Sequence, residues 1–176
     1  AFVRLRYIKS EWEREQIRAA FKLADAAYDA MKAKTAKGVS EIEVAAAGEY
    51  AVRSRSASGF GFGTIVGSGA RSNAVVPTAS SKLLEDGELV MIGISPKVNG
   101  YAGVVGDAFP VSGSYTERQQ VAIDHLKEAF RRTKAGLAIG KTGKELDAPA
   151  RTYFEEQKLS QYLVCPFVHT IGLHEA

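Results

Sequence analysis

The sequence contains a single cysteine, Cys165, among its 176 residues. One cysteine excludes an internal disulfide and a zinc site built from cysteines, and it is typical of proteins in a reducing compartment. Long apolar runs are also lacking, because the longest, at residues 89–94 and 162–168, are far too short to cross a bilayer as helices. We therefore expect a cytoplasmic protein with no membrane partner.

No strong excess of one charge is present, since 23 Lys and Arg face 20 Asp and Glu, a net charge of +3. The densest basic cluster, Arg53, Arg55 and Arg71, spans a stretch rich in Ser and Gly. Such a cluster can face phosphate groups, but a charged run is more often solvated surface, and we favour the solvated loop. Nucleic acid is not an expected partner. A hydrophobic content of 45% excludes disorder and predicts one folded domain.

Four capping boxes, in which Ser or Thr is followed three residues later by Glu or Gln, mark predicted helix starts. Each one opens an apolar pattern with helical spacing. The predicted helices cover residues 11–36, 41–50, 117–135 and 143–154, and Pro149 is expected to kink or delay the last of them. The boxes themselves are Ser10–Glu13, Ser40–Glu43, Thr116–Gln119 and Thr142–Glu145.

Strands are predicted where residues that favour β structure lie between clusters of Gly, Ser and Asn. They cover residues 60–66, 88–95, 101–111 and 162–170, and Asn99-Gly100 predicts a hairpin turn. The order is two helices, three strands, two helices and a final strand, which indicates the α+β class.

The two helix pairs also suggest an internal duplication of a helix-helix-strand unit. A shift of 104 residues aligns Arg14 with Arg118 and Glu41 with Glu145. Because capping boxes are common, coincidence is the alternative explanation.

Three motifs have ordinary explanations. Residues 135–142, AGLAIGKT, match a loosened phosphate loop, but that loop needs a preceding strand, and a helix is predicted there. The glycines between Gly59 and Gly69 interrupt strand residues, so a bulged or closely packed strand is favoured over a nucleotide loop. His169, His174 and Glu175 form a His/Glu cluster whose spacing is not that of a zinc helix, so on spacing alone they are interpreted as structural or exposed.

The order of several segments resembles the creatinase, prolidase, aminopeptidase P and methionine aminopeptidase family. This resemblance implies the pita-bread fold, built from two related halves, with the second half truncated here. It also implies that residues 1–9 are a junction from an upstream domain, that residues 10–176 are a partial catalytic-type domain, and that the protein is a homodimer. The segments that carry the resemblance are residues 8–13, 38–46, 62–69, 73–77, 87–111 and 169–173.

Measured against that family, the sequence lacks expected metal ligands. The resemblance implies two divalent ions held by two Asp, one His and two Glu, but the two Asp positions carry Gly93 and Val104. Neither residue offers the side-chain oxygen that a hard cation requires. Of the three ligand positions within the sequence only His169 remains. Asp107 lies three residues past Val104, and strand alternation predicts that its side chain points to the other face.

A further catalytic histidine of the family would follow Pro77, where this sequence has Thr78. We therefore expect a cleft marked by Thr78, Gly93 and Val104 and a family member without a cofactor that binds a peptide or small amide. The alternative is a hydrolase of altered chemistry that breaks an amide or C–N bond with His169, His174 and residues beyond the sequence. An ordinary Xaa-Pro peptidase, which would need Mn, Co or Zn, is a third reading, so the sequence leaves open whether the protein is an enzyme.

Overall fold

The computed structural model describes residues 5–55 and 57–173, and it divides into two compact units. The first unit holds the residues up to Tyr115 and the segment that starts at Ile171, and the second holds Thr116–Thr170.

All four predicted capping boxes form, and each one closes in both directions at the start of its helix. Ser10, for example, accepts a hydrogen bond from the Glu13 amide while the Glu13 carboxylate accepts one from the Ser10 amide at 2.7 Å. The helix bounds follow from these caps: α2 Glu11–Lys34, α3 Glu41–Arg53, α4 Glu117–Ala135 and α5 Gly143–Glu156. Pro149 lies inside α5 without delaying its start.

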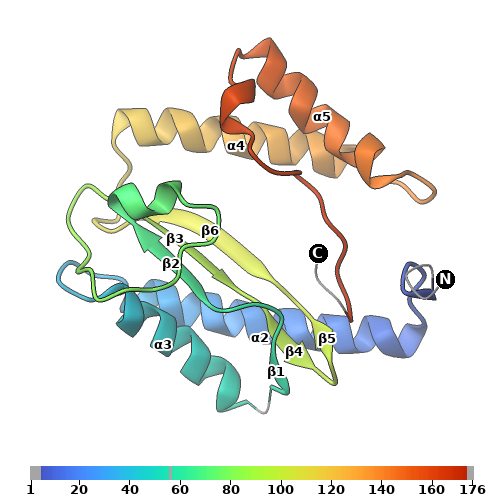
Figure 1. Cartoon of the computed structure of the whole chain (residues 1–176), viewed down its shortest axis with the longest axis horizontal. Helices are drawn as coiled ribbons and strands as arrows, with labels where there is room; N and C mark the ends of the chain where they lie inside the picture. The colour runs from blue at the N-terminus through green and yellow to red at the C-terminus, as the bar shows by residue number, and fades with distance from the viewer. Residues whose placement is uncertain (1–4, 56, 174–176) are drawn as a thin grey trace. The chain divides into compact units, whose positions relative to one another are not determined.

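The first unit contains two three-stranded sheets and the short 3-10 helix η1, Gly69–Asn73 (Figure 1). Both sheets are antiparallel, with strand orders β2-β3-β6 and β1-β4-β5. The strand bounds are β1 Gly59–Phe60, β2 Ile65–Ser68, β3 Leu89–Ile94, β4 Pro96–Val98, β5 Tyr101–Ala102 and β6 Val105–Pro110.

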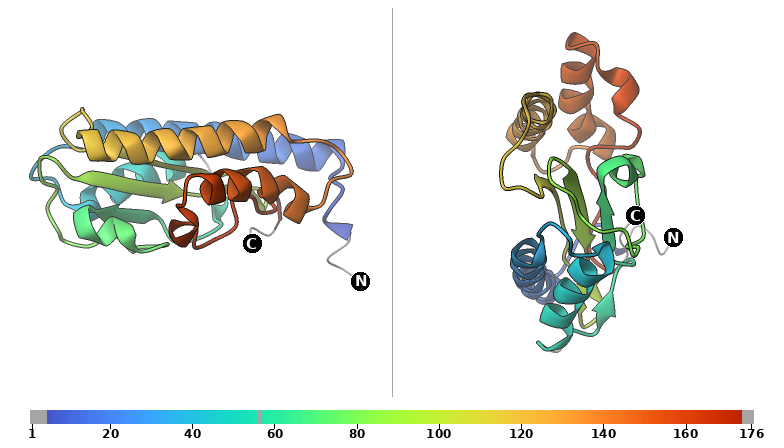
Figure 2. Two further views of the ribbon diagram at one scale, coloured as in Figure 1. Left: turned by 90° about the horizontal axis from the view of Figure 1, so that it is seen from above. Right: turned by 90° about the vertical axis from the view of Figure 1, so that its left-hand side faces the viewer.

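Helices α2 and α3 pack against each other and bury one face of the β2-β3-β6 sheet (Figures 1 and 2). Along β3 the side chains alternate, and Val90, Ile92 and Ile94 are buried against Met31 of α2 and Val44 of α3. Residues 89, 91 and 93 therefore lie on the other face of the sheet.

Several strand predictions need correction. The segment predicted as a strand at 60–66 is split, because β1 pairs with β4 whereas β2 pairs with β3. The strand predicted at 162–170 is wrong, since the 3-10 helix η2, Ser160–Tyr162, ends at its first residue and the described chain forms no strand over residues 163–170. A strand requires a neighbour to satisfy its backbone groups. Downstream of that segment, Gly172 accepts a hydrogen bond from Ala102 at 2.9 Å.

The hairpin prediction is confirmed at Asn99-Gly100, which joins β4 to β5. Both residues have positive φ, 48° and 85°, as a two-residue turn of this kind requires.

The second unit consists of α4, α5 and η2. Its core is small and contains Ala129, Ala150, Tyr153 and Phe154. Helix α4 ends at Ala135, so a helix and not a strand leads into residues 135–142, as predicted. Across the described chain, no helix is both long and apolar enough to cross a membrane.

Gly103, directly after β5, lies close against the backbone of α2. A Cβ atom there would lie 2.5 Å from the carbonyl carbon of Ala20, in the backbone of the helix. We expect Gly103→Ala to lower the free energy of unfolding by about 1–3 kcal/mol, because a helix backbone cannot move aside as a flexible side chain can. Urea denaturation measures this change. Gly63→Ala is the matched control, since nothing lies within 4 Å of its Cβ position, and equal losses in both variants would contradict the account.

Candidate functional site

The sheet face that carries Gly93 is apolar. Residues that pair directly across an antiparallel sheet share a face, and Gly93 pairs with Ile65 of β2 and with Gly106 of β6. A Cβ atom at Gly93 would lie 3.2 Å from Cδ1 of Ile65, so the isoleucine side chain occupies the space next to this position. The same face also carries Gly67, Met91 and Ala108. None of these six residues offers an oxygen or nitrogen side-chain ligand.

Asp107 points to the opposite face, as strand alternation predicts. It pairs with Ile92, whose side chain is buried against the helices. The Tyr28 hydroxyl of α2 donates a hydrogen bond to Asp107 Oδ2 at 2.8 Å. Burial, together with this carboxylate, raises the pKa of Tyr28. Asp107 is therefore held by α2 and cannot replace a ligand at Gly93.

A pocket of about 650 Å³ opens between α3 and the segments on either side of η1. Its wall is mostly apolar, with Thr64, Thr78 and Glu49 as its polar side chains. Thr78 also forms an isolated bridge with Ile65, the residue that packs against Gly93. Of the three predicted cleft residues, Thr78 lines the pocket, Gly93 adjoins it through Ile65, and Val104 is half-buried outside its lining. The apolar side chains that line the pocket include Ile42, Ala45, Phe62, Ile65, Val76 and Pro77.

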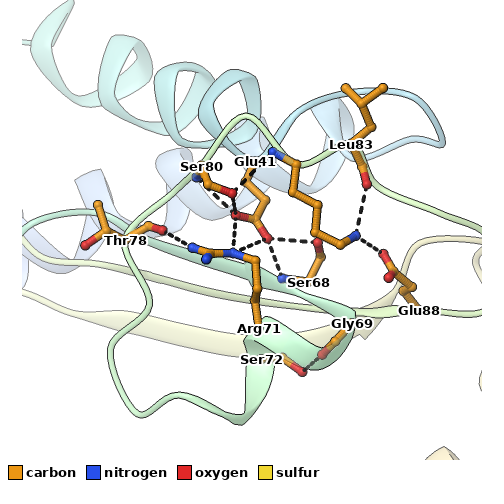
Figure 3. A network of polar contacts seen from close by, with 10 residues as sticks. Glu41, Ser68, Gly69, Arg71, Ser72, Thr78, Ser80, Leu83 and Glu88 are labelled. Carbon is orange, nitrogen blue, oxygen red and sulfur yellow. Dashed lines mark hydrogen bonds and ion pairs between the residues drawn. The ribbon is translucent and has the colours of Figure 1, made fainter.

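The wall containing Thr78 is held by the fully buried carboxylate of Glu41, in the first turn of α3 (Figure 3). Ser68, at the end of β2, donates to Glu41 Oε1 from its amide at 2.8 Å and from its hydroxyl at 2.9 Å. Ser80 donates to Oε2 in the same two ways, at 3.0 and 2.7 Å. The Arg71 guanidinium lies 3.0 Å from Oε2 and also donates to the Thr78 carbonyl at 2.6 Å. One carboxylate thus fixes both ends of residues 68–80.

Two opposing effects set the ionisation of Glu41. Burial raises its pKa, but hydrogen bonds from Ser80, Ser68 and Arg71 outweigh burial and hold the pKa below the ordinary value of 4.5. The carboxylate is therefore ionised at neutral pH and attracts the donors that surround it.

Sequence reasoning missed this cluster and interpreted Arg71 with Arg53 and Arg55 as a solvated patch. All three residues are exposed, as that interpretation requires, but each also has a partner. Arg71 pairs with Glu41, Arg53 stacks over the Phe60 ring at 5.0 Å, and Arg55 donates to the Ala51 carbonyl. An acidic residue directly after a helix N-cap was visible in the sequence, but such a residue is normally exposed. Its burial depends on donors that are 27 and 39 residues away.

The predicted catalytic histidines are not assembled into a site by the described residues. His169 is exposed, and its Nδ1 atom lies 2.9 Å from the Thr170 carbonyl. His174 lies outside the described residues. The third histidine, His125, lies 2.8 Å from the Tyr153 hydroxyl within the second unit. Among residues 5–55 and 57–173, no group of three His, Cys, Asp or Glu side chains could hold a metal ion.

Comparison with known proteins agrees with the fold and the segment order. The model of metallopeptidase family M24 matches residues 15–176. The Xaa-Pro dipeptidase of Pyrococcus furiosus is 35% identical over 169 residues, which cover 96% of this chain and 48% of that protein. The uncharacterized peptidase YqhT of Bacillus subtilis is 33% identical over 178 residues, with 98% and 49% covered.

Solved structures give the same result. The prolidase from Pyrococcus furiosus matches with a TM-score of 0.93 and 35% identity, over 98% of this chain and 51% of that one. The X-Pro aminopeptidase from Thermotoga maritima matches with a TM-score of 0.92 and 30% identity, over 98% and 49%. The chain has the pita-bread fold and belongs to metallopeptidase family M24, the family of the Xaa-Pro peptidases that it resembles. It spans about half the length of the relatives that it matches.

Glu41, Ser68, Arg71 and Ser80, together called the Glu41 cluster, allow a stability test. Glu41→Gln should lower the free energy of unfolding by about 3 kcal/mol at pH 7, because an amide cannot accept from every donor and leaves some of them buried without a partner. Urea denaturation of the variant and of the exposed control Glu85→Gln measures this loss.

The same loss should depend on pH. Because the folded-state pKa of Glu41 is lowered, its contribution is complete above 4.5 and is lost as the pH falls through the folded-state pKa. The difference between wild type and Glu41→Gln should therefore shrink below about pH 4.5. A difference that stays constant from pH 7 to pH 2 would mean that the charge of Glu41 does not stabilise the fold.

Proposed function

We propose that this family M24 domain has lost its dinuclear metal centre and binds a peptide or small amide in the pocket beside α3. The observation that carries the proposal is the apolar face around Gly93. The side chain of Ile65 adjoins this glycine at the position where the family resemblance places an aspartate ligand.

The residues present do not fit a pair of divalent ions. Mn²⁺, Co²⁺ and Zn²⁺ bind through oxygen, nitrogen or thiolate ligands. Gly93 and Val104 supply none of these, and Asp107 is held on the opposite face by Tyr28. For the same reason we rank an ordinary Xaa-Pro peptidase below a binding protein.

The pocket can still hold a ligand without the metal. Its volume of about 650 Å³ falls within the range of sites for small ligands. The apolar wall of Ile42, Phe62 and Val76 would bury the side chain of a short peptide. The Glu41 cluster keeps the wall at Thr78 in place when the pocket is empty, which reduces the ordering cost of binding. We extend the proposal to a cytoplasmic homodimer.

The alternative is a hydrolase of altered chemistry, and one observation favours it. The carbonyl of Thr170 can only accept a hydrogen bond, so the proton of neutral His169 belongs on Nδ1. Nε2 is then a free acceptor on an exposed ring and could act as a general base for amide or C–N hydrolysis. His174 and residues beyond the sequence would supply the rest of that site.

Binding in the presence of a chelator tests the proposal. The full-length protein should bind a short Xaa-Pro peptide with the same affinity in EDTA as without it. Ala46→Trp should weaken binding by about tenfold or more, because Ala46 lines the pocket and an indole would fill it. Ala33→Trp, at an exposed position of α2, is the matched control. Calorimetry measures the effects of EDTA and of Ala46→Trp on the affinity. Binding that requires added metal would overturn the proposal.

His169→Ala separates the binding protein from the hydrolase. If the protein only binds, the variant should keep the wild-type affinity for the peptide, because His169 is exposed and does not line the pocket. Peptide cleavage followed by chromatography is the second measurement. If wild type cleaves the peptide and His169→Ala lowers this turnover by a factor of 100 or more, the typical contribution of a general base, the protein is the hydrolase instead.

A further inference from the structure

Among the described residues that line the pocket, Glu49 is the only ionisable one. It lies on α3 one turn after Ala45 and Ala46 and two turns after Ile42, so these four residues form one continuous strip along the helix. The carboxylate is half-buried at the end of this strip, directly next to apolar wall.

Within the described part of the chain, no hydrogen bond or ion pair engages the Glu49 side chain. Arg53, four residues further along the helix, is the usual partner for such a glutamate. Its guanidinium instead lies over the Phe60 ring. An anion in a partly apolar wall is unfavourable unless a cation or a hydrogen-bond donor compensates it. The carboxylate of Glu49 is therefore available to a positively charged group of a ligand in the pocket.

We propose that Glu49 binds the primary ammonium group of the ligand, and that an apolar group attached next to this ammonium packs against Ile42 and Val76. This inference rests on the proposed function, since it specifies the ligand of the same pocket. The carboxylate and the apolar wall adjoin each other, so the charge and the apolar group must also be adjacent in the ligand. The α-ammonium and side chain of an amino-terminal residue have this arrangement, whereas a lysine side chain separates its charge from the backbone by four methylene groups. An ammonium donating to a carboxylate forms a charge-assisted hydrogen bond, the stronger kind.

Two ligands that differ only in the charge test the inference. Leucinamide carries the α-ammonium and an apolar side chain, and 4-methylpentanamide is the same molecule without the ammonium. Calorimetry at pH 6.5, below the usual α-amino pKa of about 7.7–8.0, keeps leucinamide charged. We expect the full-length wild type to bind leucinamide at least about tenfold more tightly than 4-methylpentanamide.

Glu49→Gln keeps the size and helix preference of the side chain and removes its charge. This variant should bind the two amides with equal affinity, through loss of affinity for leucinamide alone. Glu15→Gln, which removes an exposed charge from α2, should behave as wild type. A circular dichroism melt confirms that each variant is folded.

The outcomes separate this inference from the proposed function. If wild type and Glu49→Gln bind leucinamide equally, or if wild type does not distinguish the two amides, Glu49 is not the ammonium site. The pocket proposal then still stands, provided that Ala46→Trp weakens both amides. If wild type binds neither amide nor the short Xaa-Pro peptide, both proposals fail. The tripeptide Leu-Pro-Gly in a further titration distinguishes a peptide from a free amino-acid amide as the source of the ammonium.

Discussion

The carboxylate of Glu41 ties the start of α3 to the segments that follow β2 and precede β3. Its two oxygens accept hydrogen bonds from Ser68 and Ser80 and an ion pair from Arg71. A buried carboxylate without such partners would be strongly unfavourable, so the fold and these partners require each other. The carboxylate also uses the amide of Ser68 at the open edge of β2, where an unpaired strand could otherwise recruit another chain.

The pocket and the apolar sheet face around Gly93 are both connected to the hydrogen bonds of Glu41. Because Arg71 also binds the carbonyl of Thr78, the wall of the pocket is fixed with respect to α3. Thr78 in turn bridges to Ile65, and Ile65 packs against Gly93. The position where the family resemblance places a metal ligand is therefore continuous with an apolar pocket wall. A chain of contacts therefore joins the start of α3 to the apolar face.

Local signals predicted the helices and the hairpin because each signal is complete within a few residues. The capping boxes place their own donors and acceptors three residues apart, and Asn99-Gly100 sets its own turn. The family resemblance identified Gly93 and Val104 as the positions of the expected aspartate ligands. Strand alternation correctly placed Asp107 on the other face of the sheet.

Features that depend on distant partners could not be predicted in this way. Residues 162–170 have the composition of a strand, but β structure also needs a neighbouring strand, which the described chain does not provide. The burial of Glu41 and its pairing with Arg71 depend on contacts between segments that are distant in the sequence. The pocket that contains Glu49 is likewise lined by distant segments. The roles of His169, His174 and Val104 stay predictions.

If this domain does not use a metal ion, it should not bind one, and a metal titration measures this. Mn²⁺, Co²⁺ and Zn²⁺ would be titrated in turn into the full-length protein by calorimetry, and an Xaa-Pro peptide would be assayed on the same samples. The Xaa-Pro dipeptidase of Pyrococcus furiosus would be measured in parallel as the reference. We expect no stoichiometric binding and no release of the amino-terminal residue. Tight binding of one or two ions per chain, with turnover, would contradict this expectation.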